Sequence, residues 1–145
     1  MPIKLKMCAT ALALYLITSA ITNAASADVV AVVSAKSSVT SLTAYQLTDI
    51  FLGRSARFPD GTKAIPCDLA EDSPLRNEFY TNLIGKSQAQ IKSHWSKLIF
   101  TGRGQPPREV ATAEKAKQLV AENPNVICYI DRSQIDKSVT VLFPL

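Results

Sequence analysis

The residues best suited to chemistry in this sequence form one short segment, Ser73-Pro74-Leu75-Arg76. Serine followed by proline predicts the first turn of a helix, with Ser73 as the cap and Pro74 where no amide donor is needed. Free backbone N–H groups and the positive end of the helix dipole gather at such a start, and Arg76 adds a guanidinium, so a small anion could bind here. Alternatively, Ser73 only caps the helix and Arg76 pairs with a nearby acid, which would be Glu71, Asp72 or Glu109.

The other reactive residue types form no recognisable catalytic or metal site. The chain has one histidine, His94, and no Cys-x-x-Cys, whereas zinc sites need three or four clustered ligands. Gly85-Lys86-Ser87 resembles the end of a phosphate-binding loop, but Tyr80 occupies the position of its first glycine. No Gly-x-Ser-x-Gly motif accompanies His94. The sequence therefore favours a protein that is not an enzyme and needs no metal or cofactor.

Residues 1–27 have the three-part build of a secretory signal peptide. Lys4 and Lys6 form a basic start, an apolar stretch follows, and Ala25-Ser26-Ala27 supplies small side chains at the end. The apolar stretch is short for a membrane span, which needs about 20 residues. We therefore expect a signal peptide (1–27) and one domain secreted to the periplasm (28–145).

The charge of the expected mature protein is small. Without Lys4 and Lys6, 14 Lys and Arg residues stand against 12 Asp and Glu residues, which leaves a net charge of +2. The cations are scattered, and no basic stripe with interleaved aromatic residues occurs. Because nucleic-acid binding depends on such a concentrated positive surface, nucleic acid is not an expected partner.

Export would place Cys67 and Cys128 in an oxidising compartment, where disulfides persist. The two cysteines can pair only if their Cβ atoms come within bonding reach. A disulfide and two buried free thiols are both open from the sequence.

Apolar runs alternate with helix signals along residues 28–145. The runs predict strands at 29–33, 64–67, 126–130 and 139–143, the first of a kind typical of strands buried on both faces of a parallel sheet. Pro66 indicates a strand end or a sheet edge. Capping residues predict helices that begin after Thr43, Ser73, Ser87 and Thr112. Residues 103–108 contain a glycine and a proline pair and predict a loop. This order predicts an α/β fold with an open, mostly parallel sheet flanked by helices.

Three stretches resemble periplasmic substrate-binding proteins of phosphate ABC transporters: residues 41–53 (SLTAYQLTDIFLG), 70–76 (AEDSPLR) and 126–131 (VICYID). A short bacterial group of that superfamily is more similar still, because residues 95–107 also match its pattern. The resemblance covers nearly all of residues 29–143. It implies one lobe of a type 2 periplasmic-binding-protein-like fold, since the chain is long enough for about one of the two lobes of a full-length receptor.

The resemblance also implies a ligand and its site. A small anion such as phosphate would bind at Ser73 and Arg76, with Ser37, Ser38 or Thr40 of the first loop as further ligands. In the family, the second strand is followed by an arginine and a Gly-Ser-Gly-Thr turn. The matching positions here hold Asp68 and Asp72-Ser73-Pro74-Leu75, so only the serine is retained. These replacements disfavour a doubly charged anion.

Two functions follow as hypotheses. The first is a periplasmic solute-binding component that serves an ABC transporter permease. The second is an envelope interaction or sensor-accessory protein that keeps the lobe without ligand binding and uses Arg103, Gln105 and Arg108 as its contact loop. A homodimer that rebuilds a two-lobed cleft is a third possibility for the assembly.

Overall fold

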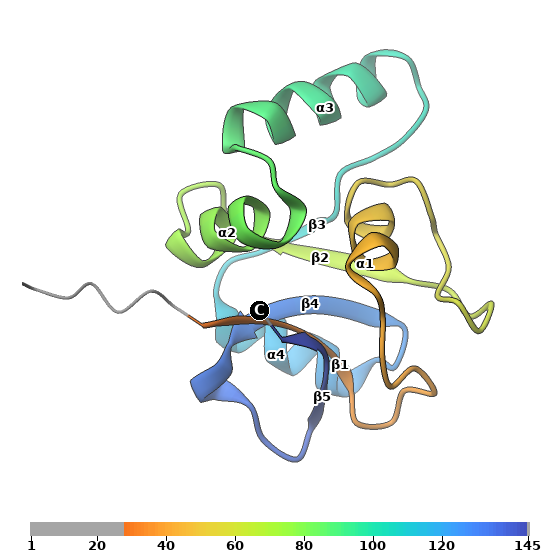
Figure 1. The fold of residues 1–145 in the computed structure, drawn as a ribbon, viewed down its shortest axis with the longest axis vertical. Helices are drawn as coiled ribbons and strands as arrows, with labels where there is room; N and C mark the ends of the chain where they lie inside the picture. Colours follow the sequence, from red (N-terminus) through yellow and green to blue (C-terminus); the bar gives the residue numbers. More distant parts are fainter. Residues whose placement is uncertain (1–27, 145) are drawn as a thin grey trace, which may run out of the picture.

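The computed structural model describes residues 28–144, so the predicted signal peptide at 1–27 lies outside the described residues. A five-stranded sheet in the order β3-β2-β4-β1-β5 forms its centre (Figure 1). The strands are β1 (Val29–Ser34), β2 (Ile65–Leu69), β3 (Arg108–Val110), β4 (Val126–Asp131) and β5 (Val139–Pro144). All four predicted strands are present, and β3 is an additional one.

The helices begin where the sequence predicts them to begin. They are α1 (Ala44–Phe51), α2 (Pro74–Glu78), α3 (Gln88–Phe100) and α4 (Ala113–Glu122). Thr43 and Ser87 form capping boxes with the glutamines three residues later, and Thr112 caps α4. A π-helix, η1 (Phe79–Ile84), continues α2, and a short 3-10 helix, η2 (Arg132–Gln134), follows β4. No helix within residues 28–144 is long and apolar enough to cross a membrane.

The sheet is mixed, and β1 is the strand that runs against the others. β2 pairs in parallel with β3 and β4, whereas β1 is antiparallel to both its neighbours, β4 and β5. Four strands therefore point the same way, which confirms a mostly parallel sheet. All six residues of β1 are buried, as its apolar sequence predicts, but the parallel environment that we expected for it is wrong. A continuous apolar run indicates burial on both faces of the sheet. A central antiparallel strand is buried in the same way, so the run does not show the direction of the strand.

Helices cover both faces of the sheet. In Figure 1, α1 lies in front of it, α4 lies behind it, and α3 forms the end of the molecule farthest from β5. Three aromatic rings join α1 and η1 to the sheet: Phe79 stacks on Tyr129 of β4 with 4.0 Å between ring centroids, and Phe51 meets Phe79 edge-on at 4.7 Å. These contacts hold the start of η1, and with it α2, against the end of β2.

One local prediction needs correction, and one is confirmed. Residues 103–108 are a loop only as far as 107, because Arg108 begins β3 and pairs with Cys67 of β2. Pro66 is the second residue of β2, so it lies at a strand end, which is one of the two predicted positions, although β2 itself is an interior strand between β3 and β4. The proline is tolerated because β3 pairs with β2 only from Cys67 onward, so that at Pro66 β2 has no partner on that side.

Candidate functional site

The carboxyl end of β2 carries a buried carboxylate, Asp68, with 6% of its surface exposed. Arg76 donates from Nε to its Oδ2 at 3.1 Å, and the Tyr80 hydroxyl donates to the same oxygen at 2.8 Å. The Tyr129 hydroxyl donates to Oδ1 in a short hydrogen bond. That hydroxyl also accepts the Leu69 N–H at 3.1 Å. A buried charge costs free energy unless it is paired and hydrogen-bonded, and Asp68 is both.

Local structure brings these donors to Asp68. Ser73 caps α2, with its Oγ accepting the Arg76 N–H at 3.4 Å, and this fixes Arg76 in the first turn. Tyr80 follows one turn later, and the Arg76 guanidinium lies over its ring at 4.9 Å from the centroid. The alternatives considered for Arg76 from the sequence, namely Glu71, Asp72 and Glu109, omit its actual partner, Asp68, eight residues earlier.

The charged and polar groups of this cluster interact mainly with one another. Burial, and then the charge of Asp68, raise the pKa of Tyr80 and of Tyr129, so both hydroxyls stay protonated and donate. Burial alone would lower the pKa of Arg76, but the Asp68 carboxylate and the two tyrosines outweigh it and raise that pKa. The positive charge that the sequence offered to an anion is therefore shared with a carboxylate of the chain itself.

The structure does not bring the five predicted ligand residues together. Ser73 and Arg76 lie at the carboxyl end of β2, whereas Ser37, Ser38 and Thr40 follow the carboxyl end of β1. Val33 is opposite Ile127 and Val29 is opposite Asp131, so β1 ends at the edge of the sheet where β4 and β2 begin. The two groups therefore occupy opposite ends of the sheet. The resemblance had joined them in one site, but β1 runs antiparallel to β4 and therefore to β2, which separates them.

The hydroxyls of the first loop serve local turns. Ser37 Oγ accepts the Val39 N–H at 3.2 Å, and Ser38 Oγ donates to Asp60 at 2.6 Å. The hydrogen bond from Ser38 is the largest of the contacts that lower the pKa of Asp60. Thr40 is exposed. The loop is thus a hydrogen-bonded turn at the amino end of β2.

The two cysteines lie side by side in the core as free thiols. Pro66 is opposite Ile127, so Cys67 and Cys128 come next on adjacent parallel strands. Cys128 donates from Sγ to the Cys67 carbonyl at 3.1 Å, and burial raises the pKa of its thiol. The structure therefore has the second of the two alternatives considered from the sequence, and the disulfide is not formed.

The proposed contact loop is exposed. Arg103 and Gln105 lie in the segment between α3 and β3, and Arg108 begins β3. Beside this segment, at the end of α3, Ile99 is 55% exposed and Phe100 is 93% exposed. Two large apolar side chains thus face solvent just before this segment in the sequence.

His94 has a structural partner. Its Nε2 lies 2.9 Å from the Leu52 carbonyl oxygen, and its ring meets Trp95 edge-on. Within residues 28–144, no three His, Cys, Asp or Glu side chains gather in a way that could hold a metal ion.

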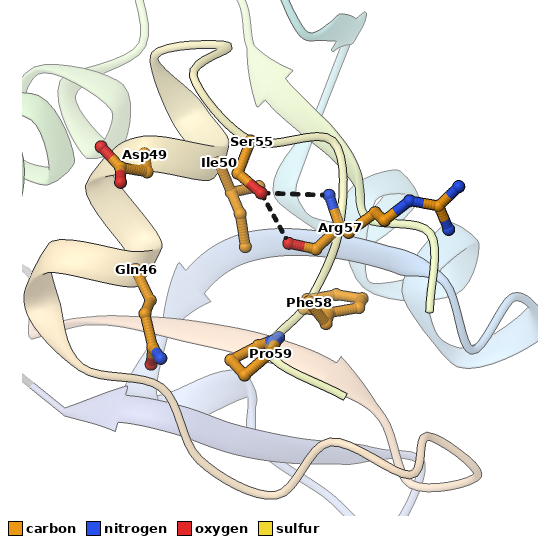
Figure 2. Close-up of a pocket in the computed structure, with 7 residues that line it drawn as sticks. All are labelled: Gln46, Asp49, Ile50, Ser55, Arg57, Phe58 and Pro59. Carbon is orange, nitrogen blue, oxygen red and sulfur yellow. Dashed lines mark hydrogen bonds between the residues drawn. The ribbon is translucent and has the colours of Figure 1, made fainter. Parts of the chain in front are cut away.

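A pocket of about 190 Å³ lies between α1 and residues 55–59 (Figure 2). Its Ser55 hydroxyl donates to the Arg57 carbonyl at 2.8 Å and accepts the Arg57 N–H at 3.2 Å. Figure 2 shows the Arg57 guanidinium pointing away from Gln46 and Asp49 on the opposite wall, and it donates instead to the Gly61 carbonyl at 2.9 Å. The polar groups of residues 55–57 are therefore engaged with the chain rather than available to a ligand.

A second pocket, of about 230 Å³, lies between the start of α2 and one face of α3. Arg76 and Trp95 line it, and both carry a buried donor, Nη1 and Nε1, with no hydrogen-bond partner in the described part of the chain. The sequence analysis did not predict Trp95 as a site residue. The signal was its position among Ile91, Ser96 and Ile99, which share its helix face.

Comparison with solved structures shows the fold of this chain. It is similar to an ABC-type phosphate transport receptor from Vibrio cholerae (TM-score 0.62, 21% identity) and to PstS from Borrelia burgdorferi (TM-score 0.60, 15% identity). A phosphate-bound protein from Clostridium perfringens is also similar (TM-score 0.63, 19% identity). No family model matches the sequence, and a search of curated proteins finds no match.

The coverage of these matches is unequal. Each covers 79% of this chain but only 44%, 45% or 46% of the other protein. The chain therefore spans less than half the length of each of these proteins, which fits the expected single lobe. The likeness confirms the fold class that the sequence predicts.

Proposed function

We propose that this protein is an exported solute-binding lobe that binds a small anion reversibly at the carboxyl end of β2, near Ser73 and Arg76. The observation that carries the proposal is the Arg76 guanidinium, which donates to Asp68 through Nε and lines a pocket of about 230 Å³. A guanidinium carries several N–H donors and is suited to an anionic oxygen. The similarity to a phosphate transport receptor and to a phosphate-bound protein gives further support.

The surroundings of Arg76 favour a singly charged ligand over phosphate. Asp68 already balances the guanidinium charge, and Pro74 supplies no amide donor at the start of α2. A dianion would therefore meet little uncompensated positive charge, and its transfer from water would cost more than it regains. In this proposal the fold is that of the phosphate receptors, but the preferred anion carries less charge.

The location and assembly of the protein follow from the same proposal. Residues 1–27 would direct export, and the lobe would act in the periplasm. A receptor of this kind would deliver its ligand to an ABC transporter permease. Two copies could together form the two-lobed cleft, and a strictly monomeric sedimentation profile with and without ligand would exclude this arrangement.

A specific observation supports a second candidate function. Phe100 and Ile99 are exposed beside Arg103 and Gln105, and large apolar side chains near arginines are enriched in protein interfaces. In this alternative the lobe is an envelope interaction module without a small ligand. A variant with Phe100→Ser would then lose its partner while keeping its thermal stability, because Phe100 makes little contact with the core.

Thermal unfolding in the presence of different anions tests the first proposal. The protein is heated with millimolar phosphate, sulfate or organic carboxylates at constant ionic strength. A ligand at about 100 times its dissociation constant adds about 2.7 kcal/mol to the free energy of unfolding, so its melting temperature rises clearly.

Arg76→Lys is the informative variant, because it retains a cation for Asp68 but removes the guanidinium donors. We expect its unliganded stability to fall modestly, because lysine does not stack on Tyr80 as the guanidinium does, and its response to the anion to disappear. Ser37→Ala, at the other end of the sheet, is the matched control and should respond like the parent. If no anion raises the melting temperature, the solute-binding proposal is wrong.

A further inference from the structure

A long stretch in the middle of the chain carries positive charge and no acid. Residues 79–108 contain five Lys and Arg residues and no Asp or Glu, whereas the rest of residues 28–145 has nine Lys and Arg residues against twelve acids. The five cations stand five or six residues apart, so no basic run is visible in the sequence. Most of the stretch is α3 and the segment after it, so the fold places this charge at one end of the molecule (Figure 1).

The outer side of α3 faces solvent. Ile91 and Trp95 are the buried residues of this helix. Phe100 follows Ile91 by nine residues, which is about two and a half turns, so Phe100 projects from the opposite side. The other residues on that side are exposed as well, namely Ala89, Ser93 and Ser96. In Figure 1, α3 lies at the end of the molecule, and no other element of residues 28–144 covers its outer side.

Large apolar side chains stand among cations on this outer side. Phe100 is 93% exposed and Ile99 is 55% exposed, both in the last turn of α3. Lys97 lies about one turn before Phe100, and Lys92 lies about two turns before Ile99, so each cation shares a flank of the helix with an apolar residue. Both lysines are exposed. The outer side of α3 is therefore amphipathic in itself, with apolar tips and basic flanks.

The cations of this surface are accessible to a partner. The Arg103 N–H donates to the Leu98 carbonyl at 2.9 Å, which holds Arg103 against the last turn of α3. Within residues 28–144, neither Arg103 nor Lys97 forms a salt bridge. Lys92 pairs with Glu71 at 3.6 Å, but both side chains are largely exposed, so this pair is weak. An anionic partner therefore has only one weak ion pair to displace.

The chemistry of this surface fits an anionic lipid bilayer better than a protein. A stable protein interface buries about 800 Å² on each partner, whereas this surface offers two large apolar side chains on an outlying helix. A peripheral membrane contact needs only a few apolar side chains that enter the boundary between headgroups and acyl chains, with Lys and Arg beside them. The cations then meet the anionic headgroups, and no acid on the helix repels them.

We propose that the outer side of α3 docks this protein onto an anionic phospholipid bilayer. Phe100 and Ile99 enter the headgroup boundary, and Lys92, Lys97 and Arg103 contact the headgroups. The contact is reversible and sensitive to salt, because much of the attraction is between charges. This inference goes beyond the proposed function and does not depend on whether Arg76 binds an anion.

Co-sedimentation with vesicles tests the docking. Purified protein is mixed with vesicles of phosphatidylcholine alone, or of phosphatidylcholine and phosphatidylglycerol, at low salt and at about 0.5 M salt. We expect binding to the vesicles that contain phosphatidylglycerol at low salt. Binding to phosphatidylcholine alone, or at high salt, should be at least about tenfold weaker, because the attraction to the cations is lost.

Two variants with matched controls assign the contact to α3. Phe100→Ser should bind about tenfold more weakly, because its side chain no longer enters the bilayer, whereas Tyr45→Ser changes another exposed aromatic residue and should bind normally. Lys97→Gln should bind about fivefold more weakly. Lys137→Gln makes the same change of charge next to β5, at the other end of the molecule, and should alter binding little. All four positions are exposed, so folding is preserved.

A Phe100→Trp variant tests insertion directly. Brominated acyl chains quench the emission of a tryptophan that enters the bilayer, so vesicles with such lipids should quench the added emission. Trp95 is only 6% exposed and is the one tryptophan of the parent, which therefore gives the background. An added emission that is not quenched would contradict the docking of Phe100.

Other outcomes would also overturn the inference. Equal binding to both kinds of vesicle, or equal weakening by Lys97→Gln and Lys137→Gln, would show an attraction that does not involve α3. If polyglutamate binds the protein as tightly as the phosphatidylglycerol vesicles and with the same dependence on Phe100, the partner is an acidic protein. If vesicles do not bind and Phe100→Ser loses a protein partner instead, the second candidate function stands and the membrane inference is wrong.

Discussion

Polar side chains gather at both ends of the sheet, but the two ends are built differently. At the carboxyl end of β2, Asp68 is buried and receives donors from α2, η1 and β4, including Tyr129, 61 residues away. At the amino end of β2, Ser37 bonds two residues along the chain and Ser38 bonds an exposed Asp60. The first end depends on the whole fold, whereas the second depends on local turns. The buried end also borders a pocket, which Arg76 lines.

Removal of the buried carboxylate should have the largest effect. Asp68→Ala leaves Arg76 as a buried cation without its partner and two tyrosine hydroxyls without an acceptor. We expect the free energy of unfolding to fall by about 4 kcal/mol, measured by urea titration. Asp60→Ala, at the other end, should cause a much smaller loss. Equal losses at the two ends would contradict the comparison.

High pH should weaken the buried end next. The pKa values of Tyr80 and Tyr129 are raised in the folded protein, by burial and by the Asp68 charge, so above about pH 10 only the unfolded chain releases these protons. Stability should therefore fall as pH rises, by about 1.4 kcal/mol per pH unit for each tyrosine.

Denaturant titrations between pH 9 and 12 measure this slope. Tyr129→Phe should lower it by about a third, because Tyr80 and the buried Cys128 thiol, whose pKa values are also raised, still contribute. Tyr45→Phe replaces a tyrosine that is 72% exposed and should leave the slope as it is. A slope unaffected by Tyr129→Phe would show that other groups cause the alkaline loss.

The cap of α2 should contribute less. Ser73→Ala removes the hydroxyl that accepts the Arg76 N–H, and such caps contribute about 1 kcal/mol. If Ser73 also helps to orient Arg76 toward a ligand, the affinity for an anion should fall as well. Ser73→Asp would restore the cap, so it should recover stability while adding a charge that weakens anion binding.

The smallest effect is expected at the exposed end. Ser38→Ala removes the main contact that lowers the pKa of Asp60, so this pKa should rise toward its ordinary value of 3.8. A lowered carboxylate pKa adds stability above the ordinary pKa, and that stability is lost as pH falls through the folded value. The stability of the variant should therefore depend less on pH in the acid range. An NMR titration of Asp60 measures the underlying change in its pKa. Its response to any anion should be unchanged.

Local chemistry was predictable from the sequence. Thr43, Ser87 and Thr112 cap the helices that they were predicted to cap, because the acceptor and the amide lie within three residues of each other. The four predicted strands were also recognisable from short stretches of sequence, because each contains a continuous apolar run. β3 was missed because it has only three residues and follows a proline pair, which on its own indicates a loop.

The candidate site was predictable only in part. Ser73 and Arg76 were identified from helix-start chemistry, but the partnership of Arg76 with Asp68 depends on where β2 ends. The separation of Ser37 from Ser73 depends on the direction of β1, which apolar content does not encode. Trp95 joins Arg76 only after α3 folds back beside α2. Each of these facts is a long-range consequence of topology.

The position of β1 also sets the order of events in folding. This first strand of the described chain pairs with β4 and β5, its last two strands, through contacts such as Val30 with Ile130 and Ala31 with Phe143. During synthesis from the amino end, β1 is made first and stays unpaired until almost all of the remaining residues, including β4 and β5, have been made. Pairing of such distant segments is slow and exposes the intermediate to aggregation. A chaperone that shields residues 29–34 until synthesis is complete would consequently raise the yield of folded protein more than one that acts on any helix.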